Sequence, residues 1–166
     1  MSVADTRKGR FWRLGLLAAA VIVLFDQATK WWIVNVLMQP VPQAVEVTPF
    51  FNLVLAWNRG VSFGTFSGGG SWMPYALTAV ALAIAAVLAT WLWRAERWFV
   101  ALGLGMVIGG AVGNVLDRVR LGAVVDFLDF HAFGWHFWAF NVADSGISVG
   151  VVLLLIDGLF PGHEKA

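Results

Sequence analysis

The chain has 166 residues, of which 60% are hydrophobic and only 13% are charged. Soluble domains are about a quarter charged, so this composition argues against a water-soluble globule and against a disordered segment. The net charge of +1 supplies no field for a polyanion, and we therefore expect no nucleic-acid partner. The absence of cysteine rules out disulfides, thiolate metal ligands and thiol catalysis.

Four segments are apolar enough, and about long enough, for the roughly 20 residues that a membrane-spanning helix needs. We expect one integral membrane domain over 1–166, an all-α bundle with spans at about 11–34, 72–93, 98–116 and 140–160. The first span contains Asp26 and Lys30, which lie four residues apart and can pair on one helix face. An alternative for this span is a cleaved signal peptide, but its apolar core runs into Asp26 without an Ala-x-Ala-like site.

The third span contains a repeat of small residues. Gly105, Gly109 and Gly113 follow one another every four residues, so they share one helix face. We expect a neighbouring helix to pack closely against that face. The same stripe can serve packing within one chain, which favours a monomer.

The distribution of Lys and Arg predicts the orientation. With the N-terminus inside, seven of these residues lie in inner segments and three in outer segments, which places both termini in the cytoplasm. The outer segments are then 39–71 and 117–139. The first has strand character and predicts a small extracytoplasmic sheet on the membrane surface. The second has six aromatic residues and two histidines within 127–138 and predicts an interfacial loop or a short amphipathic helix.

Four acids lie toward the outer ends of the spans, namely Asp26, Asp117, Asp126 and Asp144. Ionisable residues at membrane depth are costly and usually functional. Lys30 can neutralise Asp26, and Arg118 adjoins Asp117, which leaves Asp126 and Asp144 without a cation nearby in sequence. Two such carboxyl groups that meet hold one shared proton near neutral pH. The pair can activate a water and protonate a carbonyl oxygen or a leaving amine without metal or cofactor.

Other roles are open for several of these residues. Asp144 could cap the N-terminus of the fourth span, and Asp129 and Asp157 are best assigned as caps or interfacial residues. Three amides on the outer side could be turn residues or a polar network around the acids; these are Asn58, Asn114 and Asn141.

Two sequence patterns suggest other chemistry but lack the necessary context. His131 and His136 are five residues apart rather than four, so we expect no metal site. Residues 146–150 match the nucleophile-elbow pattern, but they lie inside an apolar span with no preceding strand. Their two glycines are better explained by helix packing.

A small proton-coupled transporter is the main rival to an enzyme, because membrane acids are equally normal there. A transporter needs ionisable residues through the inner half of the bilayer, where only Asp157, at the inner end of the fourth span, is present. A non-catalytic scaffold is a third reading, but it gives no reason for two bare acids in one layer.

Five blocks, in order along the chain, resemble bacterial lipoprotein signal peptidase, the signal peptidase II family. They are Asp26–Lys30, Asn58–Phe63, Gly110–Arg118, Val124–Phe127 and Phe140–Ser145. The resemblance implies four transmembrane helices, a surface β-cradle and an intramembrane aspartic endopeptidase. Its substrate would be a diacylglyceryl prolipoprotein, cleaved on the amino side of the lipidated cysteine.

The resemblance also implies roles for single residues. Asp126 and Asp144 match the catalytic dyad. The positions that build or surround the site, to which we add Asp117, are Asp26, Lys30, Asn58, Gly60, Asn114, Arg118, Asn141 and Ala143. It further implies a bacterial inner-membrane location with the site toward the outer face, contact with membrane lipid, inhibition by globomycin and no cofactor.

Overall fold

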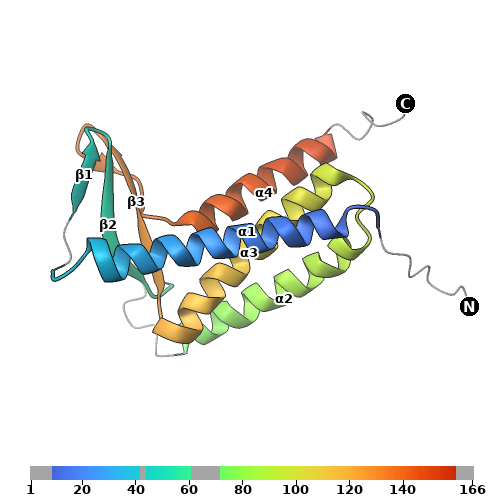
Figure 1. Ribbon diagram of the computed structural model, residues 1–166, viewed down its shortest axis with the longest axis horizontal. Helices are drawn as coiled ribbons and strands as arrows, with labels where there is room; N and C mark the ends of the chain where they lie inside the picture. The colour runs from blue at the N-terminus through green and yellow to red at the C-terminus, as the bar shows by residue number, and fades with distance from the viewer. Residues whose placement is uncertain (1–8, 42–43, 61–71, 160–166) are drawn as a thin grey trace, which may run out of the picture.

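The computed structural model describes residues 9–41, 44–60 and 72–159, which form a helical bundle with a small sheet at one end (Figure 1). The helices are α1 (Trp12–Trp32), which continues as the π-helical turn η1 (Ile33–Leu37), α2 (Met73–Trp93), α3 (Trp98–Leu121) and α4 (Val142–Leu159). The strands are β1 (Val45–Thr48), β2 (Phe51–Asn58), β3 (Val124–Ala132) and β4 (Trp135–His136).

The four helices are each long and apolar enough to cross a membrane. Their outer faces are apolar, since Leu17, Leu24 and Val87 are more than 60% exposed. Such surfaces suit hydrocarbon rather than water. The prediction of four spanning helices is therefore confirmed by length and composition.

The helix ends differ in detail from the predicted spans. The first helix continues through η1 to Leu37, and the third continues to Leu121, beyond the predicted end at 116. Gly122 then ends α3 in the left-handed conformation, with φ of 71°, and its N–H donates to the carbonyl of Arg118 at 3.1 Å. Gly suits this position because it lacks the Cβ that makes a positive φ costly.

Helix α3 lies at the centre of the bundle and packs against α1, α2 and α4. The predicted glycine face lies against α1: a Cβ on Gly109 would stand 2.6 Å from the carbonyl oxygen of Ala19. On the side toward α4, a Cβ on Gly150 would stand 2.6 Å from the carbonyl oxygen of Gly103. Bare backbone on these faces therefore lets the helices approach closely.

The beginning of α1 is held beside the turn between α2 and α3. The N–H of Gly9 donates to Trp93 at 2.8 Å, and that of Phe11 donates to Ala95 at 3.2 Å. The start of α1 and the end of α4 lie at the same end of the bundle, opposite the sheet (Figure 1).

The sheet is antiparallel, with strand order β1-β2-β3-β4, and it combines both segments that were predicted to be outer. β1 and β2 come from the connection between α1 and α2, whereas β3 and β4 lie between α3 and α4. Ala56 of β2 is in register with Asp126 of β3, and Asn58 with Val124. The two connections thereby form one platform at the end of the bundle.

The expected loop or short helix at 127–138 is wrong, because most of these residues belong to β3 and β4. Their main-chain groups pair with β2 and its turn; the N–H of His131, for example, donates to Phe50 at 2.9 Å. Aromatic side chains fit a pleated strand as well as an interfacial helix, so composition alone could not decide between them.

An apolar cluster fixes β3 against the end of α1. Val125 and Phe127 of β3 are buried together with Ile33 and Met38. Successive side chains of a strand point to opposite faces, so Asp126 points away from this cluster. The packing of Val125 and Phe127 therefore sets the direction of the Asp126 side chain between them.

Candidate active site

The first turn of α4 carries a reciprocal cap between Asn141 and Asp144. The Asn141 side-chain oxygen accepts the N–H of Asp144 at 2.9 Å, and Asp144 Oδ2 accepts the N–H of Asn141 at 3.2 Å. This is the arrangement of a capping box, in which two otherwise unpaired helix-end donors are satisfied. The capping role considered for Asp144 is therefore present in the structure.

Asp126 is buried at the β2–β3 register and receives two amide donors. Asn58 Nδ2 donates to its Oδ2 at 3.0 Å, and Asn141 Nδ2 donates to its Oδ1 at 2.7 Å. Burial raises the pKa of the Asp126 carboxyl to about 6, the charge of Asp144 adds to the rise, and the Asn58 amide opposes it. Asp126 therefore gains and loses a proton much closer to neutral pH than an ordinary aspartate.

Two amides connect Asp126 with Asp144. Asn141 contacts both acids as described, and Asn114 Nδ2 donates to Asp144 Oδ1 at 2.8 Å. Asn141 Nδ2 also reaches Asn114 Oδ1 at 3.3 Å. The predicted network of amides around the two acids is therefore present. Among the described residues neither acid is in an ion pair, but the Arg118 charge attracts both at longer range.

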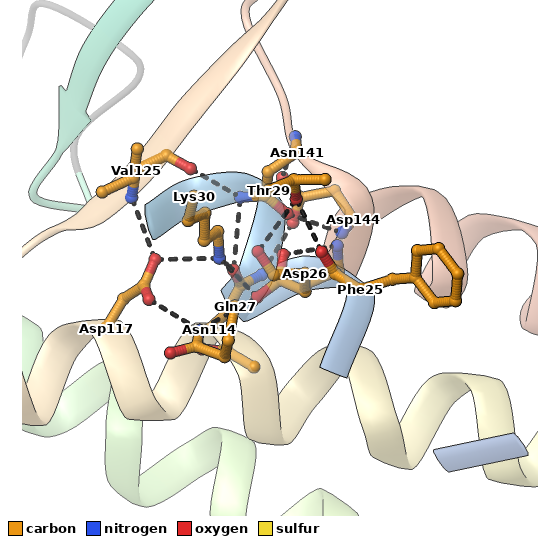
Figure 2. Close-up of polar contacts among 12 residues, drawn as sticks. Phe25, Asp26, Gln27, Thr29, Lys30, Asn114, Asp117, Val125, Asn141 and Asp144 are labelled. Carbon is orange, nitrogen blue, oxygen red and sulfur yellow. Dashed lines mark hydrogen bonds and ion pairs between the residues drawn. The ribbon is translucent and has the colours of Figure 1, made fainter. Parts of the chain in front are cut away.

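Lys30 is the buried cation of the site, and it lies between two carboxylates (Figure 2). Its Nζ is 2.8 Å from Asp26 Oδ2 and 2.8 Å from Asp117 Oδ2, and it donates to Asn114 Oδ1 at 3.2 Å. The predicted Asp26–Lys30 pair is thus confirmed. Asp117 thus pairs with Lys30 of α1, while its sequence neighbour Arg118 acts on it only at longer range.

The acids of α1 and α3 also bind main-chain groups beside the candidate dyad. Asp26 Oδ1 accepts the N–H of Ala143 at 2.9 Å, and Asp117 Oδ2 accepts the N–H of Val125 at 3.1 Å. A Cβ on Gly113 would lie 2.7 Å from Asp26 Oδ2 and 3.3 Å from the Cβ of Ala143. Small residues at 113 and 143 therefore make room for the buried Asp26 carboxylate.

Gln27 belongs to this cluster, although sequence reasoning assigned it no role. Its Nε2 donates to Asp117 Oδ1 at 2.9 Å and to Asp26 Oδ2 at 3.1 Å, and its Oε1 accepts from Arg120 at 3.2 Å. The available signal was spacing: Gln27 precedes Lys30 by three residues and so lies on nearly the same helix face.

Among the cavities next to these groups, two of about 300 Å³ adjoin the dyad and its amides. One is beside Asp126 and is lined by Ala56, Trp57, Asn58, Arg59, Asp126, Trp138 and Ala139. The other lies among α2, α3 and α4, is mainly apolar, and has Asn114 and Arg118 on its wall. Arg118 Nε is buried there without a hydrogen-bond partner in the described part of the chain. The polar groups thus adjoin one cavity at the sheet and another among the helices.

Gly60 supports the site through Asn58. Its N–H donates to Asn58 Oδ1 at 2.8 Å, and its φ of 93° is a conformation that other residues rarely adopt. This contact helps to fix the amide that binds Asp126. Residues 61–63, the remainder of that sequence block, lie outside the described residues.

Asp129 and Asp157 make their contacts away from the dyad. Asp129 accepts from Asn52 and contacts His136 Nδ1 at 2.9 Å, whereas Asp157 pairs with Arg97 at 2.8 Å. Over residues 9–41, 44–60 and 72–159 there is no group of three His, Cys, Asp or Glu side chains that could hold a metal ion.

Comparisons with known proteins identify the family of the chain. A profile of the family described as Signal peptidase (SPase) II matches residues 18–160. A lipoprotein signal peptidase of Methylobacterium sp. (strain 4-46) is 46% identical over 144 residues, which cover 87% of each chain. One of Burkholderia vietnamiensis (strain G4 / LMG 22486) is 45% identical over 140 residues, which cover 84% of this chain and 83% of the relative.

Two solved structures share the fold. Both are described as bacterial membrane enzymes determined by the in meso method, at 2.3 Å and 1.9 Å resolution. They are 31% and 30% identical to this chain, with TM-scores of 0.78 and 0.77. The similarity covers 96% of this chain in both cases, and 96% and 98% of the solved chains. The chain therefore belongs to the signal peptidase II family.

Proposed function

We propose that this protein is a lipoprotein signal peptidase that works as an intramembrane aspartic endopeptidase, with Asp126 and Asp144 as its catalytic pair. The observation that carries the proposal is the placement of these two acids. They come from different elements, are joined through Asn141 and Asn114, and have amide rather than cationic side-chain partners among the described residues. Such a pair is suited to hold one proton between two carboxyl groups.

The reaction uses that single proton. The ionised acid takes a proton from water while the water oxygen bonds to the scissile carbonyl carbon, and the protonated acid gives its proton to the carbonyl oxygen. A proton then passes to the amide nitrogen, the carbon–nitrogen bond breaks, and a carboxylic acid and an amine are formed. The raised pKa of Asp126 supports its role as the protonated member of the pair.

We propose a diacylglyceryl prolipoprotein as the substrate, cleaved on the amino side of its lipidated cysteine. Two observations support it: relatives that match most of the chain are lipoprotein signal peptidases, and the acids lie at one end of an apolar bundle. A lipidated peptide has its acyl chains in the bilayer and its scissile bond near the surface. Globomycin would compete for the same place.

We further propose that both chain termini face the cytoplasm and that the sheet and the acids face the outer side of the bacterial inner membrane. Arg94 and Arg97 lie in the turn beside the start of α1, at the end opposite the sheet. Arg10 and Arg13 at the start of α1 thus lie on the same side as Arg94 and Arg97, and the positive-inside rule assigns such a side to the cytoplasm. The single membrane domain would act as a monomer and without a cofactor.

The test is cleavage of a purified diacylglyceryl prolipoprotein in detergent, with a chelator present throughout. Asp126→Asn and Asp144→Asn keep the side-chain shape and remove the ionisable proton, so both should bind substrate and lose cleavage. Asp129→Asn is the matched control, because this acid lies on the same strand but contacts His136. Near-normal cleavage by either dyad variant would show that the aspartic mechanism is wrong.

The same experiment tests the substrate and the absence of metal. Wild type should release the signal peptide with the chelator present, and globomycin should prevent it. No cleavage of the lipidated substrate by a folded wild type would reject the assigned function. Loss of wild-type activity on chelation would instead point to metal-dependent chemistry.

A further inference from the structure

Each acid of the proposed dyad follows a residue whose main-chain N–H is bound by another carboxylate. Asp26 Oδ1 holds the N–H of Ala143, which precedes Asp144, at 2.9 Å, and Asp117 Oδ2 holds the N–H of Val125, which precedes Asp126, at 3.1 Å. Val125 and Ala143 are fully buried, so these N–H groups have no access to bulk water. The two hydrogen bonds therefore satisfy donors that would otherwise be costly to bury.

Two side chains from one turn of α1 bridge these two carboxylates. Lys30 Nζ is 2.8 Å from an oxygen of each, and Gln27 Nε2 lies 3.1 Å from Asp26 Oδ2 and 2.9 Å from Asp117 Oδ1. Figure 2 shows the Lys30 side chain directed toward Asp117 and Asn114 of α3 and Asp26 of its own helix. Lys30 and Gln27 thus hold together Asp26 and Asp117. These two carboxylates bind the main chain next to Asp144 and Asp126.

We propose that Lys30 and Gln27 are positioning residues for peptide hydrolysis, which set the separation of Asp126 and Asp144 by bridging Asp26 and Asp117. The proposal rests on the proposed function, because it assigns to the bridge the geometry that this dyad needs. Two acids can share a proton and one water only at a fixed separation, and small misplacements of catalytic groups are expensive.

Lys30 and Gln27 lie away from the cavity beside Asp126, so they act on the dyad through Asp26 and Asp117. Lys30 and Gln27 do not line the cavity beside Asp126; they line a different cavity of about 320 Å³, together with Trp31 and Asp117. Without the Lys30 ammonium, two buried carboxylates would face each other, and one would take up a proton or turn away. Either response weakens the grip on the N–H of Val125 or Ala143.

The kinetic test compares Lys30→Met and Gln27→Met with wild type. Methionine has a similar length but has no charge and no N–H donor. We expect Lys30→Met to lose about 10²-fold in kcat, the cost of a misplacement of about 1 Å, while KM stays within about twofold. Gln27→Met, which keeps the cation, should show a smaller loss of kcat with the same unchanged KM. Unchanged kcat, or a rise in KM alone, in Lys30→Met would overturn the proposal.

Arg97→Met is the matched control. It breaks another 2.8 Å ion pair, which joins Arg97 of the α2–α3 turn to Asp157 of α4 at the opposite end of the bundle and is only partly buried. If ion pairs between helices only hold the bundle together, Arg97→Met and Lys30→Met should lose kcat alike in proportion to their loss of thermal stability. The positioning role predicts that Arg97→Met keeps the wild-type kcat.

A second readout does not depend on the reaction. Hydrogen exchange measured by NMR should become at least about tenfold faster at the amides of Val125 and Ala143 in Lys30→Met, and should not change there in Arg97→Met. Wild-type rates at both amides would overturn the bridge even if kcat fell. If Lys30→Met does not fold, Gln27→Met decides by the same two measurements. If wild type cleaves nothing, the proposed function fails, while exchange still reports on the bridge.

Discussion

Asn141 and Asp144 bind each other twice across the first turn of α4, through contacts of 2.9 Å and 3.2 Å. The same Asn141 side chain donates to Asp126 at 2.7 Å. Asn141 therefore caps the helix. Its side-chain oxygen binds the main chain of Asp144, and its side-chain nitrogen binds the carboxyl group of Asp126. These functions can be separated by substitution.

Asn141→Ser should separate helix capping from contact with Asp126. Serine is a good N-cap and its hydroxyl can accept the N–H of Asp144, but it cannot donate to Asp126 as the amide does. We expect a melting temperature near that of wild type and a loss of about 10²-fold in kcat, as for a misplaced catalytic group.

Asn141→Ala is the companion variant, because it removes the cap as well. It should lose the same activity and in addition about 1 kcal/mol of stability. Thermal melts and single-turnover cleavage of both variants provide the comparison. Wild-type kcat in Asn141→Ser would show that the contact between Asn141 and Asp126 is dispensable.

The pH dependence of kcat/KM should report on Asp126. If Asp126 must be protonated in the free enzyme, the rate falls as pH rises through its pKa of about 6. Asn58 donates to the ionised form and so lowers this pKa; Asn58→Ala should therefore raise it and move the falling limb to higher pH. A pH–rate profile of the variant measures the shift.

Asn52→Ala is the control for this profile. Asn52 lies on the same strand as Asn58, but its amide donates to Asp129 at 3.2 Å, away from the dyad. In Asn52→Ala, the falling limb of the pH–rate profile should lie at the same pH as in wild type. A limb that moves to lower pH in Asn58→Ala would contradict the assignment of the proton to Asp126.

Gly113→Ala should disturb the site without touching substrate. The new Cβ would lie 2.7 Å from Asp26 Oδ2, so the carboxylate that holds the N–H of Ala143 must move. We expect a loss of about 1–3 kcal/mol in stability, as is usual for overpacking, together with reduced kcat. Thermal unfolding and cleavage rates check both effects.

Gly158→Ala is matched to that variant. It makes the same change in α4, where an added Cβ meets no atom within 4 Å. Stability and kcat should both be preserved, because alanine favours a helix over glycine. Equal behaviour of the two variants would mean that the close contact at Gly113 has no consequence.

The sequence predicts the helical part of the fold because its signals are local. Long apolar runs mark the spans, and the spacing of Asp26 and Lys30 marks their pairing within one helix. The glycine repeat indicates close packing, although only the structure identifies α1 as the neighbour. These features depend on periodicity, which a single sequence displays directly.

The contacts that the sequence could not supply join distant segments. The sequence offers Arg118 as the neighbour of Asp117, whereas the structure brings Lys30 from α1 to that place. β3 was missed for the same reason, since its identity as a strand depends on pairing with β2. Such pairing is set by packing rather than by local propensity.

The polar centre joins the first described helix, α1, to the last, α4. This connection determines when the site can form during synthesis of the chain. Asp26 and Ala143 bind each other although 117 positions separate them, and Asn141 and Asp144 belong to the start of the last helix. A nascent chain that has emerged only as far as β3 possesses Asp126 but neither its partner acid nor the amide between them. The proposed dyad and the amide that joins its two acids are therefore complete only when α4 has packed against α1 and α3.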